Sequence, residues 1–384
     1  MIRWPFLAER AERKGAGDAL WRPRWSGEFR SGPADVEPPA GYEAQVREAF
    51  GRNAIAQRAV RLVAESVGYA PVTTAEGGHP ALGLISPPLL ETVATHLLLH
   101  GNAWIETGLD HEGRPGALWA LRPERVRAED DADGWPKAWL YRVGQRDIRF
   151  PAEGDSGRPG LLHLKTVNPL DDRLGQGCLG AAIGPVMLLN AAARWNRALI
   201  ANAARPSGAI VHESKSGVPL SADQFDRLKE EIEAGFQGAA NAGRPMLLDG
   251  GLRWQPLALT PAELDFARAR EAAAREVALA FGVPPMLLGL PGDSTHANYA
   301  EANVALWRLT VLPMLGRILS SFSAHFQRWW PQTRLEVDLD RIPALWDDRE
   351  RLWRHVAAAS FLTTDEKREM LGWAPLGEVA ETRP

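Results

Sequence analysis

Two long helical segments that bracket a compact insert constrain this chain more than any other feature. The first, residues 180–204, is rich in alanine and carries small residues on nearly every face. The second, residues 261–282, begins at Thr260-Pro261-Ala262-Glu263, a capping box with proline at the first helical position. Because both helices have few large apolar side chains, neither forms a core alone, and the pattern predicts packing between subunits.

The segment before these helices predicts an α+β domain with a mainly antiparallel sheet. Apolar residues follow one helical stripe from 42 to 67, and Pro87 begins a second helix that ends at Gly101. The strand-like runs are 69–73, 103–107, 117–121, 139–143, 147–150 and 161–167. Residues 1–41 are rich in proline and glycine, and we expect them to form a flexible arm.

The insert and the C-terminal part alternate short strands with helices. In the insert, a capping box at Ser221 begins a helix that runs to 236. The predicted strands are 209–213, 245–248, 252–257 and 334–339, and the predicted C-terminal helices are 298–330, 347–359 and 363–371. Pro313 lies inside the first of these helices and should kink it.

Composition excludes several classes of protein. The only cysteine is Cys178, so neither an internal disulfide nor a multi-cysteine zinc site is expected. No run approaches the roughly 18 apolar residues of a membrane span, and the charged N-terminus is unlike a secretion signal. The 44 basic and 48 acidic residues leave a net charge of −4. That balance disfavours gripping nucleic acid by bulk charge, but it permits a protein that lets nucleic acid pass.

One motif suggests nucleotide chemistry. Residues 175–180 spell G-x-G-x-x-G before a helix, the dinucleotide fingerprint. The preceding strand ends near Val167, and the stretch between Asp172 and Glu213 has no acidic residue to hold a ribose. A flexible hinge that leads into the helix is therefore the preferred interpretation.

Other titratable residues do not form a catalytic pattern. His96 and His100 share a helix face, but Leu97 stands where the zincin pattern needs glutamate, so both are expected in or near the core. Cys178 lacks a placed histidine, and no serine-hydrolase or phosphate-loop motif occurs. The residues therefore predict no enzyme activity, no metal and no cofactor.

Several short blocks of sequence, taken together with their order along the chain, resemble a known family. They are 98–105 (LLHGNAWI), 202–208 (NAARPSG), 220–238, 241–244 (NAGR), 247–251 (LLDGG), 281–289 (FGVPPMLLG), Asn298, 309–313 (LTVLP) and 362–368 (LTTDEKR). These blocks resemble the portal proteins of tailed double-stranded-DNA bacteriophages of the Hong Kong phage type, over about residues 42–373. The short, arginine-rich chain is similar to a domesticated relative, such as the portal of a gene transfer agent.

The resemblance implies a ring, typically of twelve subunits, at one capsid vertex, through which DNA enters and leaves. It implies an α+β, portal-like fold with a mixed wing, a two-helix stem, a small α/β clip, a long kinked spine helix and a short crown. The implied layout is arm 1–41, wing 42–179, stem 180–206, clip 207–260, stem 261–282, tunnel loop 283–297, spine helix and strand 298–342, and reduced crown and tail 343–384.

The resemblance also implies partners and contact residues. The tunnel loop would touch DNA through Asp293, Ser294, Thr295 and His296. The clip would dock the terminase packaging motor and the head-tail adaptor through Arg227, Lys229, Glu230 and Glu233. The major capsid protein is a further expected partner, no membrane is involved, and the expected location is the virion, after assembly in the host bacterial cytoplasm. The alternative is an oligomeric adaptor or scaffold of a particle that conducts no DNA.

Overall fold

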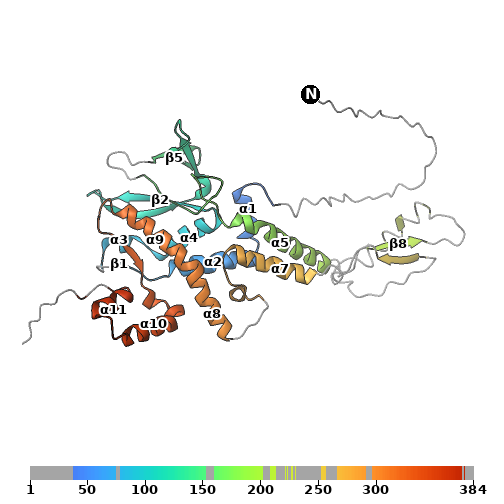
Figure 1. The fold of residues 1–384 in the computed structure, drawn as a ribbon. Coiled ribbons are helices and arrows are strands. Elements are labelled where there is room, and N and C mark those ends of the chain that lie inside the picture. Colours follow the sequence, from blue (N-terminus) through green and yellow to red (C-terminus); the bar gives the residue numbers. More distant parts are fainter. Residues whose placement is uncertain are drawn as a thin grey trace, which may run out of the picture. The chain divides into compact units, whose positions relative to one another are not determined.

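The structure, a computed structural model, describes most of the chain between residues 38 and 376 (Figure 1). The described residues are 38–74, 78–152, 160–201, 208–212, 221, 223, 226, 227, 230, 252–256, 266–290, 296–373 and 376. The chain divides into two compact units, Met1–Asp35 and Val36–Pro384, and every described residue belongs to the second. The arm predicted at 1–41 therefore lies almost wholly outside the described residues.

Four helices stand at the start of the described chain, and among them α4 packs against α2. They are α1 Tyr42–Ala49, α2 Ala54–Gly68, α3 Pro80–Leu84 and α4 Pro87–Leu99. The single helix predicted for 42–67 is wrong, because Asn53 is extended there and its side chain accepts two backbone N–H groups from the next turn. Helix α4 begins at Pro87 as predicted, with Ser86 as its N-cap, and Gly101 at positive φ follows its end.

The strands pair only in the antiparallel direction within the described residues. The first domain holds β1 Val72–Thr74, β2 Asn102–Leu109, β3 Pro115–Leu121, β4 Val126–Asp130, β5 Pro136–Val143, β6 Arg146–Pro151 and β7 Leu162–Lys165. They form two three-stranded sheets, β3-β2-β7 and β4-β5-β6, while β1 pairs with β10 Leu335–Val337. The antiparallel direction is confirmed, but one sheet was expected where two are present.

Two hairpins of this domain share one turn design that the sequence analysis missed. In the β2–β3 turn, the carboxylate of Asp110 accepts the backbone N–H groups of Glu112 and Arg114. In the β4–β5 turn, the carboxylate of Asp131 accepts the backbone N–H groups of Asp133 and Trp135 in the same way. A glycine at positive φ, Gly113 or Gly134, stands three residues after each aspartate. The repeated D-x-x-G spacing is therefore the local signal that closes both hairpins.

A long helical segment begins at His296, where the sequence predicts a helix over 298–330. It consists of α8 His296–Leu306, a π-helical turn Trp307–Val311 and α9 Leu312–Phe326, without a break in helical structure. Pro313 stands just after the π turn, where the helix is locally wider. The kink expected at this proline stays a prediction. The end of α9 is tied to the β2–β3 hairpin by His325, whose Nε2 lies 2.8 Å from the hydroxyl of Thr107.

The C-terminal part contains two helices, α10 Trp346–Ala358 and α11 Thr364–Met370. The helix predicted at 363–371 is present, and it begins with a capping box: the Thr363 hydroxyl accepts the Glu366 N–H and the Glu366 carboxylate accepts the Thr363 N–H. None of the described helices combines the length and apolarity that a membrane crossing requires. The observed mixture of helices and antiparallel strands confirms the α+β class.

One core joins elements that are far apart in the sequence. Fully buried apolar side chains come from α2, α4, α9 and two further helices, α5 Leu179–Ala201 and α7 Phe266–Ala280. Examples are Val63, Leu97, Val186, Val277 and Phe322. A smaller cluster around Trp104 and Trp139 lies between the two three-stranded sheets. The long helices are therefore anchored in the same core as the N-terminal domain.

Candidate functional site

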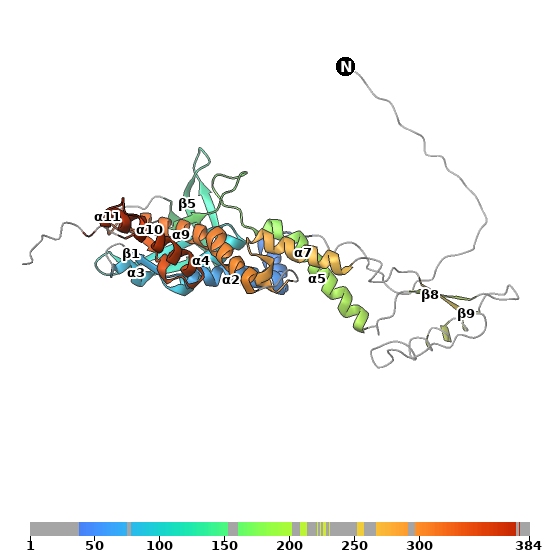
Figure 2. The same ribbon diagram turned by 60° about the horizontal axis from the view of Figure 1, so that its bottom comes forward.

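Two long helices that bracket the insert pack against each other (Figures 1 and 2). They are α5 Leu179–Ala201 and α7 Phe266–Ala280, and between them β8 Gly208–His212 pairs with β9 Leu252–Pro256. The contact uses small residues: Ala182 and Ala192 on α5 and Ala273 and Ala274 on α7 are at most 3% exposed. Because alanine side chains are short, the two helices can pack closely within the chain. The packing between subunits that the composition predicts stays a prediction.

The start of α5 is fixed by a glycine contact. An added β-carbon on Gly175 or Gly177 would collide with backbone atoms of Gly101, of Leu99 or of both. Gly101 itself has φ +84° and would collide with the backbone of Gln176. The flexible hinge expected at G-x-G-x-x-G is therefore wrong: the first two glycines are small so that two backbone segments can touch.

The side chain of Asn102 forms buried hydrogen bonds across the same contact. Its amide oxygen accepts the Gly175 N–H at 2.7 Å and the His163 imidazole at 2.9 Å, and its amide nitrogen donates to the Gly175 carbonyl at 2.8 Å. Asn102 is 1% exposed, so these bonds replace water. The imidazole of His163 also stacks on Trp104, with ring centroids 4.6 Å apart. The β3-β2-β7 sheet and the loop before α5 are thereby joined at one buried point.

A second buried amide fixes the middle of α5. The Asn53 side chain donates to the Asn190 amide oxygen at 3.0 Å, and Asn190 donates to the Glu48 carbonyl at 3.0 Å and to the Glu48 carboxylate at 3.1 Å. These bonds connect α5 to α1 and α2. Both asparagines are buried, at 6% and 7% exposure, so losing either partner would leave a buried polar group unpaired.

The end of α7 is tied to the π turn. Gly282 has φ +65°, its carbonyl accepts the Thr310 hydroxyl at 2.6 Å, and a β-carbon there would lie 2.8 Å from that hydroxyl. Val283 is buried, and Leu287 and Leu288 of the short 3₁₀ helix Pro285–Leu288 pack on the core. The loop 283–297 therefore has an apolar base, and its residues 291–295 lie outside the described part.

Most predicted contact residues cannot be placed. Asp293, Ser294 and Thr295 lie outside the described residues, and His296 is the first residue of α8. In the insert, Arg227 and Glu230 are helical and exposed, whereas Lys229 and Glu233 lie outside the described residues. The assignments of these side chains to DNA or to partner proteins remain predictions.

The surface charge of the helix pair differs from that of the whole chain. Within their bounds, α5 carries two arginines and no acidic residue, and α7 carries three arginines and two glutamates. The net charge is therefore +2 on α5 and +1 on α7, against −4 for the chain. Arg275 pairs with Glu271 at 2.9 Å one turn away. A positive helix pair can attract a polyanion without a specific binding pocket.

Buried histidines are neutral structural groups. Burial lowers the pKa of His96 to about 4 and the pKa of His163 to about 3. The prediction that His96 and His100 are core or boundary residues is confirmed, since His100 also packs edge-on against Tyr42 and Trp104. Among the described residues, no three His, Cys, Asp or Glu side chains converge to hold a metal ion.

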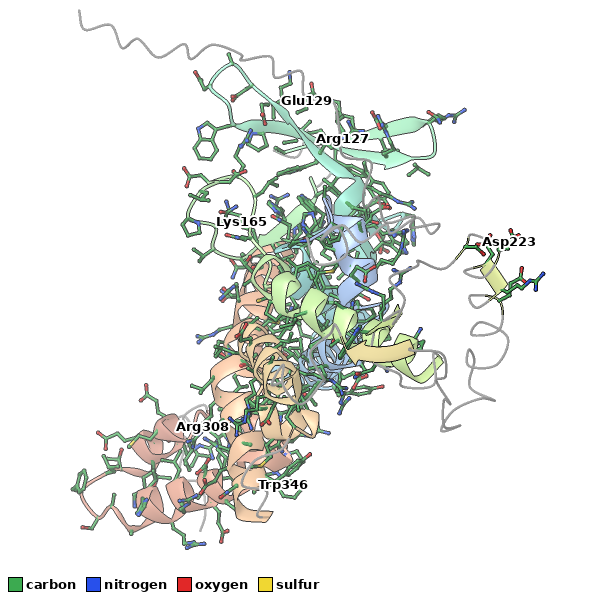
Figure 3. The ribbon with its side chains drawn as sticks, turned by 90° about the vertical axis from the view of Figure 1, so that its right-hand side faces the viewer. Arg127, Glu129, Lys165, Asp223, Arg308 and Trp346 are labelled. Atoms are coloured by element: carbon green, nitrogen blue, oxygen red, sulfur yellow. The ribbon has the colours of Figure 1, made fainter. Side chains whose placement is uncertain are left out.

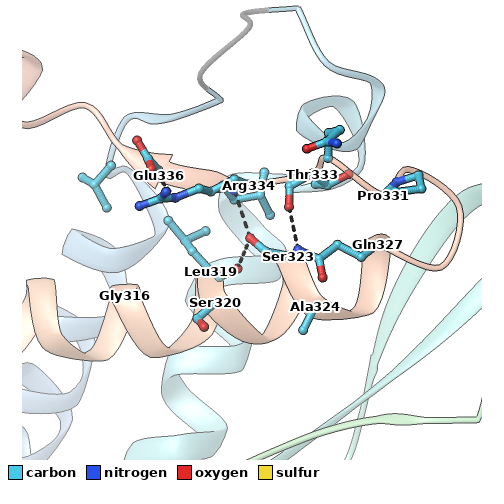
Figure 4. A pocket seen from close by; sticks show the side chains of 13 residues that line it. Gly316, Leu319, Ser320, Ser323, Ala324, Gln327, Pro331, Thr333, Arg334 and Glu336 are labelled. Carbon is cyan, nitrogen blue, oxygen red and sulfur yellow. Dashed lines mark hydrogen bonds and ion pairs between the residues drawn. The ribbon is translucent and has the colours of Figure 1, made fainter. Parts of the chain in front are cut away.

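A groove of about 640 Å³ runs between α9 and the segment that ends in β10 (Figure 4). Ser323 bridges its two sides: its hydroxyl donates to the Leu319 carbonyl at 2.7 Å and accepts the Leu335 N–H at 2.9 Å. The charged residues on its wall, Arg334 and Glu336, pair with each other at 2.6 Å. The groove therefore presents hydroxyls and small residues rather than an acid–base pair.

Comparison with known proteins decides the family. The phage portal protein family matches residues 54–372. The chain belongs to that family. A probable portal protein of Streptomyces phage phiC31 is 30% identical over 290 residues, which are 69% of this chain and 61% of the relative. An uncharacterised protein of Rickettsia bellii is 36% identical, over 85% of this chain and 88% of the relative.

Solved portal-family structures share the fold. A chain from the neck of an empty gene transfer agent particle has a TM-score of 0.68 and 40% identity, covering 88% of this chain and 96% of that one. A portal protein of the HK97 phage family from Corynebacterium diphtheriae has a TM-score of 0.55 at 18% identity, which supports the fold alone. The resemblance of the sequence blocks to portal proteins of this type is thereby confirmed.

Proposed function

We propose that this portal-family chain forms a ring of twelve copies at one vertex of a particle, and that double-stranded DNA enters and leaves through the ring axis. The observation that carries the proposal is the small-residue helix pair α5–α7 in a chain 41% identical to one from the neck of a native gene transfer agent particle, computed with twelve-fold symmetry. Helices of this kind pack efficiently between neighbouring copies.

The segments take the roles of the portal layout. Residues 42–179 form the wing, 180–206 and 261–282 the stem, 207–260 the clip, 283–297 the tunnel loop, 298–342 the spine, and 343–384 a reduced crown. Three features support this division: the wing-to-stem joint at Asn102, the β8–β9 pairing in the insert, and the apolar base of the loop.

The proposed role is mechanical rather than catalytic. The clip docks first the packaging motor and then the head-tail adaptor, and the rim contacts the major capsid protein. Assembly takes place in the host cytoplasm, and the ring ends in the particle. Support comes from the neck structures of related particles.

Passage of DNA demands weak contacts along the axis. DNA carries one charge per about 1.7 Å of axis, and six to ten phosphate contacts already give steep, salt-dependent binding. The net charge of +3 on each helix pair draws DNA to the ring, whereas Asp293, Ser294 and Thr295 give the loop short polar groups without positive charge. The loop thus lets DNA slide.

Native mass and negative-stain images test the proposal. Twelve copies of the 42.1 kDa chain form a particle of about 505 kDa with an axial hole. A ring without a hole favours the alternative, a scaffold or adaptor that conducts no DNA. A chain that stays monomeric when co-expressed with its capsid and motor proteins would contradict both.

A further inference from the structure

The imidazole of His79 lies between two parts of the chain that are far apart in the sequence. It precedes α3, where its Nδ1 accepts the backbone N–H of Ala81 at 3.2 Å. On the other side of the ring, Nε2 lies 3.3 Å from the hydroxyl of Thr333, in the turn between α9 and β10. The ring also meets that of Trp330 edge to face, with centroids 5.5 Å apart. One side chain therefore connects the start of α3 to the turn after α9.

The hydrogen bonds around this ring define its protonation state. A backbone N–H can only donate, so the Nδ1 atom that accepts from Ala81 carries no proton. The Thr333 hydroxyl has a single proton and donates it to the Trp330 carbonyl at 2.7 Å, so it can only accept from His79. The proton of the imidazole is therefore on Nε2. Both contacts require the same neutral tautomer.

A second proton on the ring removes the acceptor that caps α3. Protonated Nδ1 would point its proton at the N–H of Ala81, and two donors cannot share a hydrogen bond. Helix α3 has five residues, and a helix this short depends on its cap and on packing because it is not stable alone. Histidine is the side chain whose ordinary titration falls between about pH 5 and pH 8. Mild acid is therefore sufficient to break this cap.

The neighbouring elements carry few charged or titratable groups. Within their bounds, α3 and the strands β1 and β3 that it contacts carry none. The turn after α9 carries Arg328, and Arg334 pairs with Glu336 of β10 at 2.6 Å. His325 of α9 is neutral, because burial lowers its pKa to about 4. The acidic side chain of this group is already paired, so it does not supply the acceptor that a protonated His79 would need.

We propose that His79 is a pH-dependent latch: its neutral ring fastens the start of α3 to the turn after α9, and protonation of the ring releases both. Thr333 also lines the groove between α9 and β10, so release frees one wall of that groove (Figure 4). The latch acts within a single chain, and it stands or falls separately from the proposed ring.

Hydrogen exchange at two pH values tests the latch. Peptides that cover Ala81 and Leu82 are followed by mass spectrometry at about pH 7.5 and about pH 5.5, and the rates are converted to protection factors. Protection in the wild type falls about fivefold on acidification, which corresponds to the ~1 kcal/mol that an N-cap contributes. In H79N protection stays constant, because asparagine caps helices without titrating. In H79A it is low at both pH values. An equal pH dependence in wild type and H79N overturns the proposal.

The pH window separates His79 from the carboxylates. An unperturbed carboxyl group has a pKa near 4, and ion pairing lowers it further. For example, the hydrogen bond from Arg149 lowers the pKa of Glu129, which Figure 3 labels. H111N is the matched histidine control, because His111 is exposed in the β2–β3 turn. Its Ala81 peptide should respond to pH as in the wild type, and a lost response there would contradict the assignment to His79.

The tautomer provides a second test that is independent of helix stability. Nitrogen-15 NMR is recorded on a chain labelled in its histidine imidazoles, and the signals that disappear in H79N belong to His79. At about pH 7.5 these signals should show a protonated Nε2 and an unprotonated Nδ1. The opposite tautomer, or a charged ring at that pH, overturns the proposal.

Discussion

Gly175 lies against Gly101 so closely that neither residue could carry a β-carbon without a backbone collision. The contact joins the turn after α4 to the loop that begins α5, and Asn102 seals it with two hydrogen bonds to Gly175. Helix α5 therefore starts from a fixed point beside β2. The following predictions begin with this joint.

Gly175→Ala should lower the free energy of unfolding by about 2–4 kcal/mol, because a backbone must move away and buried bonds to Asn102 are strained. Gly180→Ala is the matched control: nothing lies within 4 Å of its added β-carbon, and it stands in a helix. That variant should be neutral or more stable by up to about 1 kcal/mol. Urea denaturation of both proteins measures the difference, and equal midpoints would refute the packing argument.

Acid should destabilise the fold through its buried histidines. The pKa of His163 is lowered by burial to about 3, and the pKa values of His96 and His325 to about 4. In the unfolded chain the value is about 6.5, so below that pH the unfolded state binds more protons and stability falls. Each histidine removes about 1.4 kcal/mol per pH unit between roughly pH 6 and its folded pKa.

Denaturation curves at pH 7.5 and pH 5 measure this slope. His163→Gln removes one titrating group and should flatten the dependence, whereas the exposed His111→Gln should leave it unchanged. If the unfolding free energy of wild type and of His163→Gln depended equally on pH, His163 would not be a buried, neutral group in the folded protein.

Pro313 should matter for ring closure more than for folding. It cannot donate to the carbonyl of Leu309, four residues earlier in the π turn, and a proline inside a regular helix costs about 3 kcal/mol. Pro313→Ala should restore regular α-helix, shift Thr310 away from Gly282 and reduce ring yield. A structure of the variant and native mass measure both effects. An unchanged π turn with normal rings would contradict the prediction.

The clip surface should control docking. Arg227→Glu with Lys229→Glu reverses two charges in the insert, where Arg227 is helical and exposed. Rings should form normally, since surface charges alter stability by less than about 0.5 kcal/mol, but adaptor or motor attachment should fail. Particle yield and binding to purified adaptor report the defect. Filled particles with normal tails would refute the docking role.

The tunnel loop should tolerate little positive charge. Asp293→Arg adds twelve positive charges to one level of a dodecamer and should slow DNA passage, with relief as salt rises. Asp133→Arg, in the exposed β4–β5 turn, is the control with the same charge change. Packaging rates at low and high salt distinguish the two. Unchanged packaging by Asp293→Arg at low salt would contradict the assignment of this loop to the channel lining.

The sequence by itself determined the elements whose signals are local. Pro87 after Ser86 began α4, Thr363 with Glu366 capped α11, and the alanine content of α5 indicated close helix packing, because capping and side-chain size act within a few residues. Only the tertiary structure decided what the glycines near residue 175 do. A hinge and a backbone contact have the same sequence, and the difference is Gly101, more than 70 residues away. The helix break at Asn53 could not be predicted from the sequence for the same reason. The residue that holds the Asn53 side-chain amide, Asn190, comes from a helix that is distant in the sequence.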